Sequence, residues 1–478
     1  MSPSATIKAA EYLFQRLRQL GIDSIHGVPG DYNLTILDIV QPSGLRWVGN
    51  ANELNDGNFD RFAEMYRHVT VAQTRLWDPR TIPEQIDSML LQCLLQSRPV
   101  YIDIPVDVVD VLVSAHRLET KIPSNPSNPF YDAALKRVIE RVYAAKQPAI
   151  IVDGEIRAIG IMNQVQDFVR STNWPTWVMG FGKGLLDETL PNFHGVYRGK
   201  FDTGESRAFL ESADLILCFG PHFSSTNTFA FSSIPAAEKT ISFSNTEVNM
   251  GGETIRDIPA RYIVPGLLQM LDVSKAHSYS PYPNLPRDRL VPLADCPPKE
   301  KIIQDKVWGL MANFFRTGDI IMGETGTAGY GVRHIPLPPQ SRLFSPVTWL
   351  SIGYMLPAAQ GAALAQQELQ SSEDYCGPKN GRTVLFIGDG GFQVTVQELS
   401  TIIRHNLNVV VFLIHNDGYT IERCIHGLKE DYNDVAPWRY LVPRISSEPL
   451  KVHSLLERRR GPNCEIFLST ENWLMIRG

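Results

Sequence analysis

Several features that would narrow the class of protein are missing from this sequence. Its six cysteines are scattered without a Cys-x-x-Cys pair, which argues against a zinc or dithiol motif and favours free thiols in a reducing compartment. Basic and acidic residues nearly balance, 45 against 51, and no basic tract indicates nucleic-acid binding. Neither a signal-peptide core nor a run of 18 apolar residues occurs, so we expect a cytoplasmic protein that does not bind membranes.

The proline and polar content suggests how the chain is divided. With 478 residues it is long enough for two to four domains. Two stretches are predicted to be linkers, 121–129 and 277–298, and the second holds six prolines. They separate segments 1–120, 130–275 and 299–478. Short apolar runs alternate with helical patterns in these segments, which predicts the α/β fold class.

Candidate strands are recognised as short apolar runs that end in turn residues. One Gly-rich stretch, 180–184, resembles a phosphate loop only superficially, because it lacks the required spacing and has no Ser or Thr after Lys183. The strands expected in the first two segments are 25–31, 45–49, 98–105, 149–152, 176–178, 215–219 and 240–243.

The stretch 383–418 carries the most informative pattern. Residues 383–387 and 409–414 are apolar runs typical of buried strands, and 395–405 between them has the apolar stripe of a helix. Strands joined through a helix are expected to lie parallel, so their carboxyl ends open on one edge of the sheet. Asp389 and Asn416, 27 residues apart, each follow one of these strands. We therefore expect the two side chains to converge.

Two oxygen ligands at such an edge suit Mg²⁺, which prefers octahedral oxygen coordination and often shares it with phosphate groups. Gly390 and Gly391 would let backbone N–H groups approach a phosphate closely. The alternative is that Gly-Asp-Gly and Asn-Asp-Gly are ordinary turns. The strand–helix–strand pattern around them favours a Mg²⁺–diphosphate site.

Six ordered motifs together resemble the thiamine-diphosphate-dependent 2-oxo-acid decarboxylases. The resemblance covers most of residues 5–440. It implies three doubly wound parallel-sheet domains: pyrimidine-binding (1–120), central (130–275) and diphosphate- and Mg²⁺-binding (299–478). The matching stretches are 26–33 (HGVPGDYN), 52–55 (NELN), 324–327 (ETGT), 349–353 (WLSIG), 388–390 (GDG) and 416–422 (NDGYTIE).

The resemblance also implies roles for single residues in cofactor binding. Glu53 matches the carboxylate that bonds to the pyrimidine ring and favours the tautomer needed to activate the thiazolium carbon. Ile352 matches the bulky side chain that holds the cofactor bent. Thr325 and Thr327 match cofactor contacts. The implied metal ligands are Asp389, Asn416 and the carbonyl of Gly418, while His415 stands where the family usually has Asn.

The implied reaction is non-oxidative decarboxylation of a 2-oxo acid, with pyruvate expected, to an aldehyde and CO₂. Asp31 and Glu422 match the two acids that the family uses for proton transfer, and Glu53 completes the catalytic set. In the family, the first domain of one subunit faces the third domain of another. The resemblance therefore implies a homodimer or a dimer of dimers, with no nucleic-acid partner.

The order of the motifs departs from the family after Asn55. Asp56-Gly-Asn-Phe59 follows at once, although in the family it lies tens of residues downstream, just after a pair of adjacent histidines. None of the 11 histidines here adjoins another. The first domain is therefore expected to be truncated and to lack strands of its interior. From about Leu441 the tail also diverges from the family.

Two other interpretations of the function remain open at this point. The chain could be a catalytically impaired homologue that binds thiamine diphosphate or a sister subunit without turnover, as the missing histidines suggest. It could also be another thiamine enzyme, such as a carboligase, although the motifs around Asp31 and Glu422 weigh against that.

Overall fold

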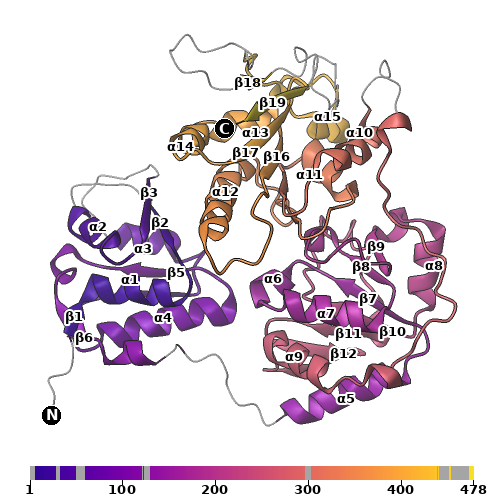
Figure 1. The fold of residues 1–478 in the computed structure, drawn as a ribbon, viewed down its shortest axis with the longest axis horizontal. Helices are drawn as coiled ribbons and strands as arrows, with labels where there is room; N and C mark the ends of the chain where they lie inside the picture. The colour runs from indigo at the N-terminus through magenta and orange to yellow at the C-terminus, as the bar shows by residue number, and fades with distance from the viewer. Residues whose placement is uncertain are drawn as a thin grey trace. The chain divides into compact units, whose positions relative to one another are not determined.

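The computed structural model describes residues 6–27, 33–49, 60–120, 122, 130–295, 303–438, 440, 452–453 and 473–477. The chain forms two units, residues 1–127 and 128–478 (Figure 1). Within the described residues, no helix is both long and apolar enough to cross a membrane.

In the first unit, the described strands form three separate pairs. β2 lies parallel to β3, β4 lies parallel to β5, and β1 lies antiparallel to β6. No hydrogen-bonded ladder joins these pairs among the described residues, as expected for a sheet that lacks part of its interior. The elements are β1 (Thr6–Lys8), α1 (Ala9–Gln19), β2 (Ser24–Gly27), α2 (Leu34–Val40), β3 (Arg46–Gly49), α3 (Asp60–Tyr66), β4 (Ala72–Arg75), α4 (Ile82–Gln96), β5 (Val100–Asp103) and β6 (Leu112–Ser114).

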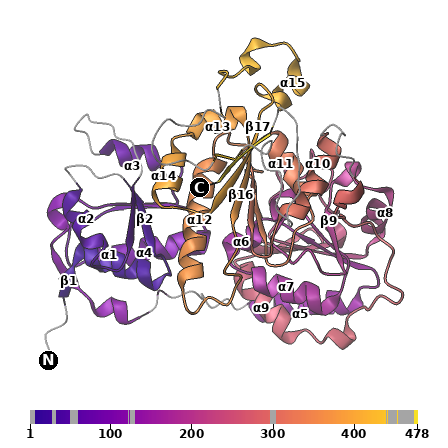
Figure 2. The same ribbon diagram turned by 45° about the horizontal axis from the view of Figure 1, so that its top comes forward.

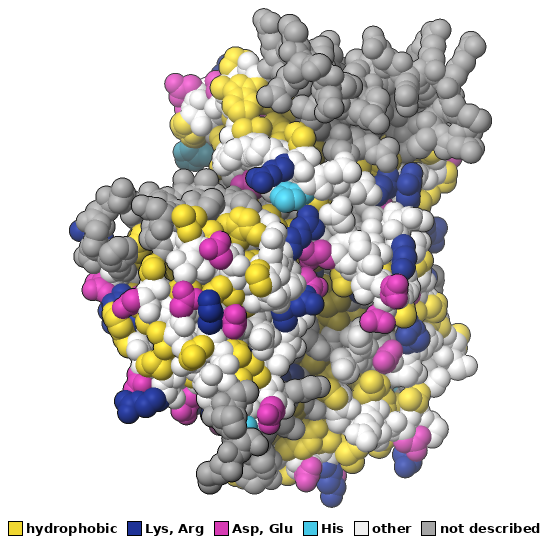
Figure 3. All heavy atoms as spheres, turned by 60° about the vertical axis from the view of Figure 1, so that its left-hand side comes forward, with side chains coloured by type: hydrophobic (Ala, Val, Ile, Leu, Met, Phe, Trp, Pro, Cys, Tyr) yellow, Lys and Arg dark blue, Asp and Glu magenta, His cyan; other side chains and the backbone are white. Residues whose placement is uncertain are grey.

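Helices α1 and α4 hold this unit together. Arg16 of α1 is buried and donates to both carboxylate oxygens of Asp87 on α4, at 2.8 and 2.9 Å. Tyr12 donates to the same carboxylate, so the buried guanidinium has a counter-charge. Apolar side chains of this unit are nevertheless exposed at several places, among them Met65, Val69 and Trp77. Figure 3 shows one face of the molecule, where apolar side chains lie scattered among charged ones.

The second unit contains a seven-stranded sheet in the order β13-β12-β11-β10-β7-β8-β9. Strands β7 to β11 are parallel to their neighbours, and β12 and β13 extend the sheet in antiparallel fashion. The strands are β7 (Pro148–Val152), β8 (Thr176–Val178), β9 (Phe193–Val196), β10 (Leu215–Phe219), β11 (Thr240–Phe243), β12 (Glu247–Met250) and β13 (Glu253–Arg256). The four strands predicted here are confirmed to within one residue.

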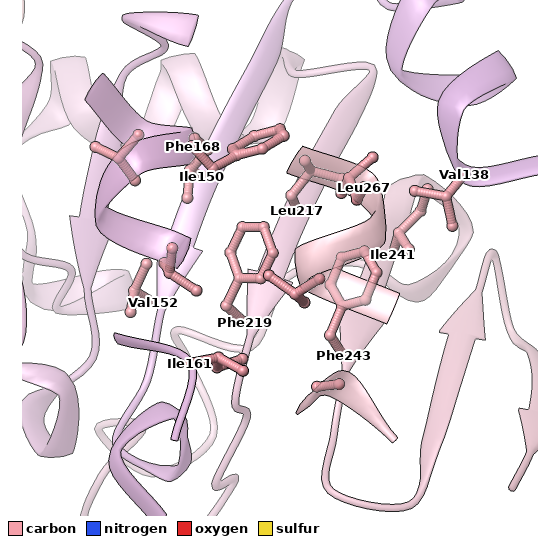
Figure 4. Close-up of a cluster of buried hydrophobic side chains, with 14 of the residues drawn as sticks. Val138, Ile150, Val152, Ile161, Phe168, Leu217, Phe219, Ile241, Phe243 and Leu267 are labelled. Atoms are coloured by element: carbon pink, nitrogen blue, oxygen red, sulfur yellow. The ribbon is translucent and has the colours of Figure 1, made fainter. Parts of the chain in front are cut away.

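Apolar side chains on one face of this sheet form a large buried core with the helices that cover it. Ile150, Leu217 and Phe219 point from the strands toward Phe168 of α7 and Leu267 of α9 (Figure 4). Such burial is the main favourable term in folding, at about 25 cal/mol per Å² of apolar surface. The helices of this part are α5 (Tyr131–Ala144), α6 (Glu155–Ile159), α7 (Met162–Thr172), α8 (Gly204–Ser212) and α9 (Ala260–Met270).

The proline-rich stretch 277–295 is tied to this sheet rather than separated from it. The indole N–H of Trp174 donates to the carbonyl of His277 at 2.7 Å. His194, which is buried, lies 2.9 Å through Nδ1 from the carbonyl of Pro286 and 2.8 Å through Nε2 from the hydroxyl of Tyr282. The sequence predicts a linker without such contacts; the structure shows that the stretch packs on the seven-stranded sheet.

A second sheet of this unit has the order β15-β14-β16-β17-β19-β18. β14 to β17 are parallel, and β19 lies antiparallel to β17. In Figure 2, β16 and β17 run side by side, with α12 and α14 beside them. The elements are α10 (Gln304–Met311), β14 (Ile320–Gly323), α11 (Thr327–Gly331), β15 (Arg342–Phe344), α12 (Met355–Ser371), β16 (Thr383–Gly388), α13 (Asp389–Thr395), α14 (Glu398–Arg404), β17 (Val409–Ile414), α15 (Thr420–His426), β18 (Val452–His453) and β19 (Trp473–Arg477).

The connection between β16 and β17 differs from the prediction in one respect. The two strands are parallel as predicted. The helix expected over 395–405 is present as α14, and a further helix, α13, precedes it. α13 begins at Asp389, directly after the strand, because Gly388 has extended backbone and acts as its N-cap. The site residues 389–391 therefore lie in the first turn of a helix rather than in a loop.

Candidate functional site

The carboxylate of Asp389 is the centre of the candidate site. It is fully buried at the end of β16 and accepts hydrogen bonds from the backbone N–H groups of Gly390, Asn416 and Gly418, at 2.9 to 3.3 Å. Nδ1 of His415 lies 3.0 Å from Oδ2 of Asp389. The parallel pairing of β16 with β17 thus brings together residues that the sequence places 27 positions apart.

The amide of Asn416 has two possible orientations beside this carboxylate. In one, Nδ2 donates to Oδ1 of Asp389 at 3.3 Å and to the carbonyl of Gly418 at 3.1 Å, and Oδ1 accepts from the hydroxyl of Thr420 at 2.7 Å. In the other, Oδ1 faces the same two oxygens at those distances. Three oxygens brought so close repel one another unless a cation lies between them.

The spacing in the second orientation suits Mg²⁺. Six oxygens placed 2.0–2.1 Å from a magnesium ion in an octahedron are about 3 Å from their neighbours. The distances between the Asn416 amide and its two oxygen neighbours are close to that value. The residues present therefore fit a hard divalent cation.

A hollow of about 450 Å³, part of it open to solvent, adjoins these oxygens. We call it the cofactor hollow. It contains every cofactor and metal residue that the sequence predicts for segment 299–478, and also Glu422. Its lining residues are Thr325, Gly326, Thr327, Ala328, Ile352, Gly388, Asp389, Gly390, Gly391, Ile414, Asn416, Gly418, Tyr419, Thr420, Ile421 and Glu422.

Two glycines of the cofactor hollow permit approaches that a side chain would block. Gly418 has φ of +123°, and a Cβ there would lie 2.1 Å from the carbonyl of Asn433. A Cβ on Gly390 would lie 2.5 Å from the ring of Tyr419. Glycine is therefore required where the backbone of the 416–420 loop meets α13 and residue 433.

Glu324 belongs to the site, although the sequence indicates no role for it beyond its place in the motif 324–327. Its carboxylate is buried at the end of β14 and accepts from the backbone N–H of Thr325 at 2.7 Å and of Met355 at 3.1 Å. Burial raises the pKa of the Glu324 carboxyl, although these backbone hydrogen bonds oppose the rise. The contacts fix the position of the Thr325–Thr327 turn relative to the start of α12.

His415 is the second residue that sequence reasoning missed, since it was noted only as a departure from the family. Nδ1 lies beside Asp389, and Nε2 lies 3.6 Å from a carboxylate oxygen of Asp417. One ligand atom from each of these three residues falls within 4.8 Å of the others. The sequence signal that could have identified His415 is its position directly after a buried strand.

Two predicted catalytic residues and the Gly-rich stretch 180–184 remain to be placed. Asp31 and Glu53 lie outside the described residues. In the Gly-rich stretch 180–184, Lys183 is buried and forms a 2.6 Å ion pair with Glu188. Lys183 is therefore already paired, in agreement with the prediction that this stretch is not a phosphate loop.

Comparison with protein families defines the class of enzyme. Residues 135–271 match the family described as "Thiamine pyrophosphate enzyme, central domain", and residues 324–442 match "Thiamine pyrophosphate enzyme, C-terminal TPP binding domain". The second range contains the whole cofactor hollow. Fold and site thus define a thiamine-diphosphate-dependent enzyme, with thiamine diphosphate and Mg²⁺ as its cofactors.

Individual relatives narrow this class. The chain is 47% identical to a pyruvate decarboxylase of Aspergillus parasiticus, over 91% of this chain and 86% of that protein. It is 34% identical to a pyruvate decarboxylase of Aspergillus terreus, over 90% of this chain and 86% of that protein. The chain belongs to the pyruvate decarboxylase family of thiamine-diphosphate-dependent 2-oxo-acid decarboxylases.

A solved structure agrees with the fold. The thiamine diphosphate-dependent 4-hydroxybenzoylformate decarboxylase of Rhodococcus jostii RHA1 superposes with a TM-score of 0.67, covering 90% of this chain and 91% of that one, at 16% identity.

The alignment with the Aspergillus parasiticus protein also bears on the motif order. It extends over 505 positions, more than the 478 residues of the whole chain. Part of the relative therefore has no counterpart in this chain.

Proposed function

We propose that this chain binds thiamine diphosphate with Mg²⁺ and decarboxylates a 2-oxo acid, with pyruvate as substrate, to an aldehyde and CO₂. The observation that carries the proposal is the cofactor hollow, where the ends of β14, β16 and β17 bring the predicted residues together. The pyruvate decarboxylases among its relatives support the choice of substrate.

Three oxygen donors would hold the metal: the carboxylate of Asp389, the amide oxygen of Asn416 and the carbonyl of Gly418. Gly390 and Gly391, in the first turn of α13, would admit the diphosphate. A Cβ on Gly391 would lie 2.8 Å from the side chain of Glu324, so this position too is limited to glycine.

When bound, thiamine diphosphate supplies a carbon nucleophile for the 2-oxo carbon and accepts the electron pair that the departing carboxylate leaves. The apolar side chain of Ile352 would hold the cofactor in its bent conformation, and Thr325 and Thr327 would contact the cofactor. Glu422 would exchange a proton with the substrate. Asp31 would serve as the second acid, and Glu53 would hold the proton at the pyrimidine nitrogen.

A second copy of the chain would complete the site, as a homodimer or a dimer of dimers. Apolar side chains beside the cofactor hollow support this proposal, since such surfaces mark interaction sites. Trp349 is 88% exposed, and Tyr354 and Val394 are also exposed. We further propose the three-domain division at 1–120, 130–275 and 299–478 and a cytoplasmic location.

A specific observation favours a second candidate function, a homologue that binds the cofactor without turnover. The join at Asn55 and Asp56 removes the adjacent histidines that the family uses. A positioned acid–base group typically contributes roughly 10²–10⁴-fold to rate. Loss of the pair would therefore leave binding intact and depress turnover.

Two measurements on the full chain separate these candidates. Calorimetric titration with thiamine diphosphate in the presence of Mg²⁺ tests binding, and a coupled assay for acetaldehyde tests turnover of pyruvate. Binding together with turnover supports the enzyme. Binding without turnover supports the second candidate, and absence of Mg²⁺-dependent binding contradicts both.

A further inference from the structure

A second hollow in the 128–478 unit shares no lining residue with the cofactor hollow. It encloses about 310 Å³, part of it open to solvent. We call it the arginine hollow. Its lining residues are Val196, Arg198, Phe229, Asp288, Tyr330, Arg333 and His334. The first four belong to the part of the chain that holds the seven-stranded sheet, and the last three follow β14 in the second sheet, so both halves of the unit build the hollow.

Arg333 is the residue of this hollow that needs an explanation. It is only 5% exposed, yet its Nε and Nη1 have no hydrogen-bond partner among the described residues. Its guanidinium forms no ion pair with a described carboxylate. Cζ lies 5.1 Å from the centroid of the Tyr330 ring, and Nη1 packs against Gly180. Burial lowers the pKa of Arg333 to about 10. A buried cation left without a counter-charge is costly.

The charges around Arg333 do not supply that counter-charge. Arg198 contributes a second guanidinium, whose Nε is also buried without a partner and whose Nη1 lies 3.4 Å from Nδ1 of His334. The lining carboxylate, Asp288, lies 3.9 Å from Nζ of Lys183. Lys183 is closer to Glu188, at 2.6 Å, and Asp288 forms no ion pair with Arg333 or Arg198 among the described residues. The two guanidinium groups line the same space.

Two guanidinium groups that share a hollow with free N–H donors are a recognised arrangement for oxyanions, because each fork can donate to two oxygens. A water molecule could accept two of these hydrogen bonds but would leave the charge uncompensated. The space would hold an ion of a few heavy atoms and no nucleotide. We propose that the arginine hollow binds a small oxyanion, a phosphate or a carboxylate, between the central and the C-terminal parts of the chain.

The test is to titrate the full-length protein with inorganic phosphate, acetate or chloride at constant ionic strength and to measure its thermal unfolding midpoint. A ligand that binds only the folded state raises the unfolding midpoint in proportion to the logarithm of its concentration. We expect the midpoint to keep rising with the logarithm of the phosphate or acetate concentration and not to change with chloride. The same anion should give a saturable heat of binding in calorimetry. The anion that responds tells the two oxyanion classes apart.

Variants assign the response to this hollow. Arg333→Met and Arg198→Met should each weaken the oxyanion at least tenfold, whereas Arg404→Met, which removes an exposed arginine of α14, should leave it unchanged. Without anion, Arg333→Met should unfold at the same or a higher temperature, because it removes an uncompensated buried charge. Arg198→Met, in a half-buried position, gives the same test if Arg333→Met does not fold.

Three outcomes would overturn the proposal. They are no response of the wild-type chain to either oxyanion, an equal response to chloride, and a response that persists in both arginine variants. The last would place the anion elsewhere, for instance in the cofactor hollow, which these substitutions leave intact. None of them bears on whether thiamine diphosphate binds, so the proposed function can fail or hold independently.

Discussion

Nδ1 of His415 lies 3.0 Å from Oδ2 of Asp389, while Oδ1 of the same carboxylate faces the amide of Asn416. His415 therefore fixes the position of Oδ2, while Oδ1 is the atom that faces the proposed metal. Partners of this kind orient metal ligands, and their loss typically costs about 10–100-fold in metal affinity.

This relationship predicts different effects for two substitutions of His415. His415→Leu removes the hydrogen bond, so we expect Mg²⁺ affinity to fall about tenfold or more. His415→Asn keeps a donor near Oδ2, and its affinity should stay close to wild type. Titration of Mg²⁺ at fixed thiamine diphosphate, followed by calorimetry, checks both. Equal affinities for the two variants would show that His415 does not position Asp389.

Asp389→Ala tests the metal assignment itself. The carboxylate is the only charged member of the proposed ligand set, so we expect Mg²⁺-dependent cofactor binding to be abolished. Asp374→Ala, which removes an exposed carboxylate from the same part of the chain, is the matched control and should bind normally. Undiminished binding by the Asp389 variant would refute the assignment.

Gly418→Ala tests the close approach of the 416–420 loop to residue 433. The new Cβ would lie 2.1 Å from the carbonyl of Asn433, in a backbone conformation with φ of +123°. The loop must shift, so we expect a loss of about 1–3 kcal/mol of stability and weaker Mg²⁺ binding. Thermal unfolding and metal titration measure the two effects.

Gly361→Ala is a suitable control for that substitution. Gly361 lies inside α12, and a Cβ there would meet no described atom within 4 Å beyond the backbone of its own helix. Alanine in a helix interior is favoured over glycine by about 0.5–1 kcal/mol, so this variant should be slightly more stable than wild type. Loss of stability in both variants would mean that the close contact at Gly418 is not the cause.

His194 predicts a pH dependence of stability. Burial lowers its pKa from 6.5 to about 4, so the folded state keeps the imidazole neutral where the unfolded chain takes up a proton. The folded state should therefore lose stability as pH falls from about 6.5 to about 4, by up to about 3 kcal/mol from this group. In His194→Gln, denaturant unfolding should show a smaller loss between pH 7.5 and 5. The same loss in both proteins would contradict the prediction.

The join at Asn55 and Asp56 predicts what would restore turnover. The family resemblance implies that a segment with the adjacent histidines belongs between Asn55 and Asp56, so the test is to insert there the unmatched segment of the Aspergillus parasiticus relative. We expect acetaldehyde formation to rise about 10²–10⁴-fold over the original chain. The same insert with both histidines changed to alanine separates proton transfer from repair of the fold. A chain that is fully active without the insert would contradict the hypothesis of an impaired homologue.

The strands of the second unit could be predicted from sequence because they are continuous apolar runs with turn residues at their ends, as at 215–219 and 409–414. The position of the metal site at one edge of the sheet could be predicted because β16 and β17 are joined through helices and lie parallel. The start of α13 was missed because Gly388 and Gly390 suggested a turn, whereas Asp389 accepts the N–H of Gly390 within the first helical turn.

Contacts made by backbone carbonyls and by single polar side chains could not be predicted. The stretch 277–295 has little apolar periodicity, yet Trp174 and Arg287 attach it to the seven-stranded sheet through main-chain oxygens. Such bonds leave no pattern in the sequence. The same holds for Arg333, whose burial depends on how two sheets pack rather than on its neighbours in the chain.

The division into two units, each with a buried apolar cluster of its own, has a consequence for heating experiments. The cofactor hollow lies wholly within residues 324–422 of the second unit, so Mg²⁺ with thiamine diphosphate stabilises that unit by mass action. The first unit, with its separate strand pairs, would gain support from the cofactor only through the proposed contacts of Asp31 and Glu53. Calorimetric scans should then resolve two endotherms, of which the one from the second unit moves upward more as the cofactor concentration rises.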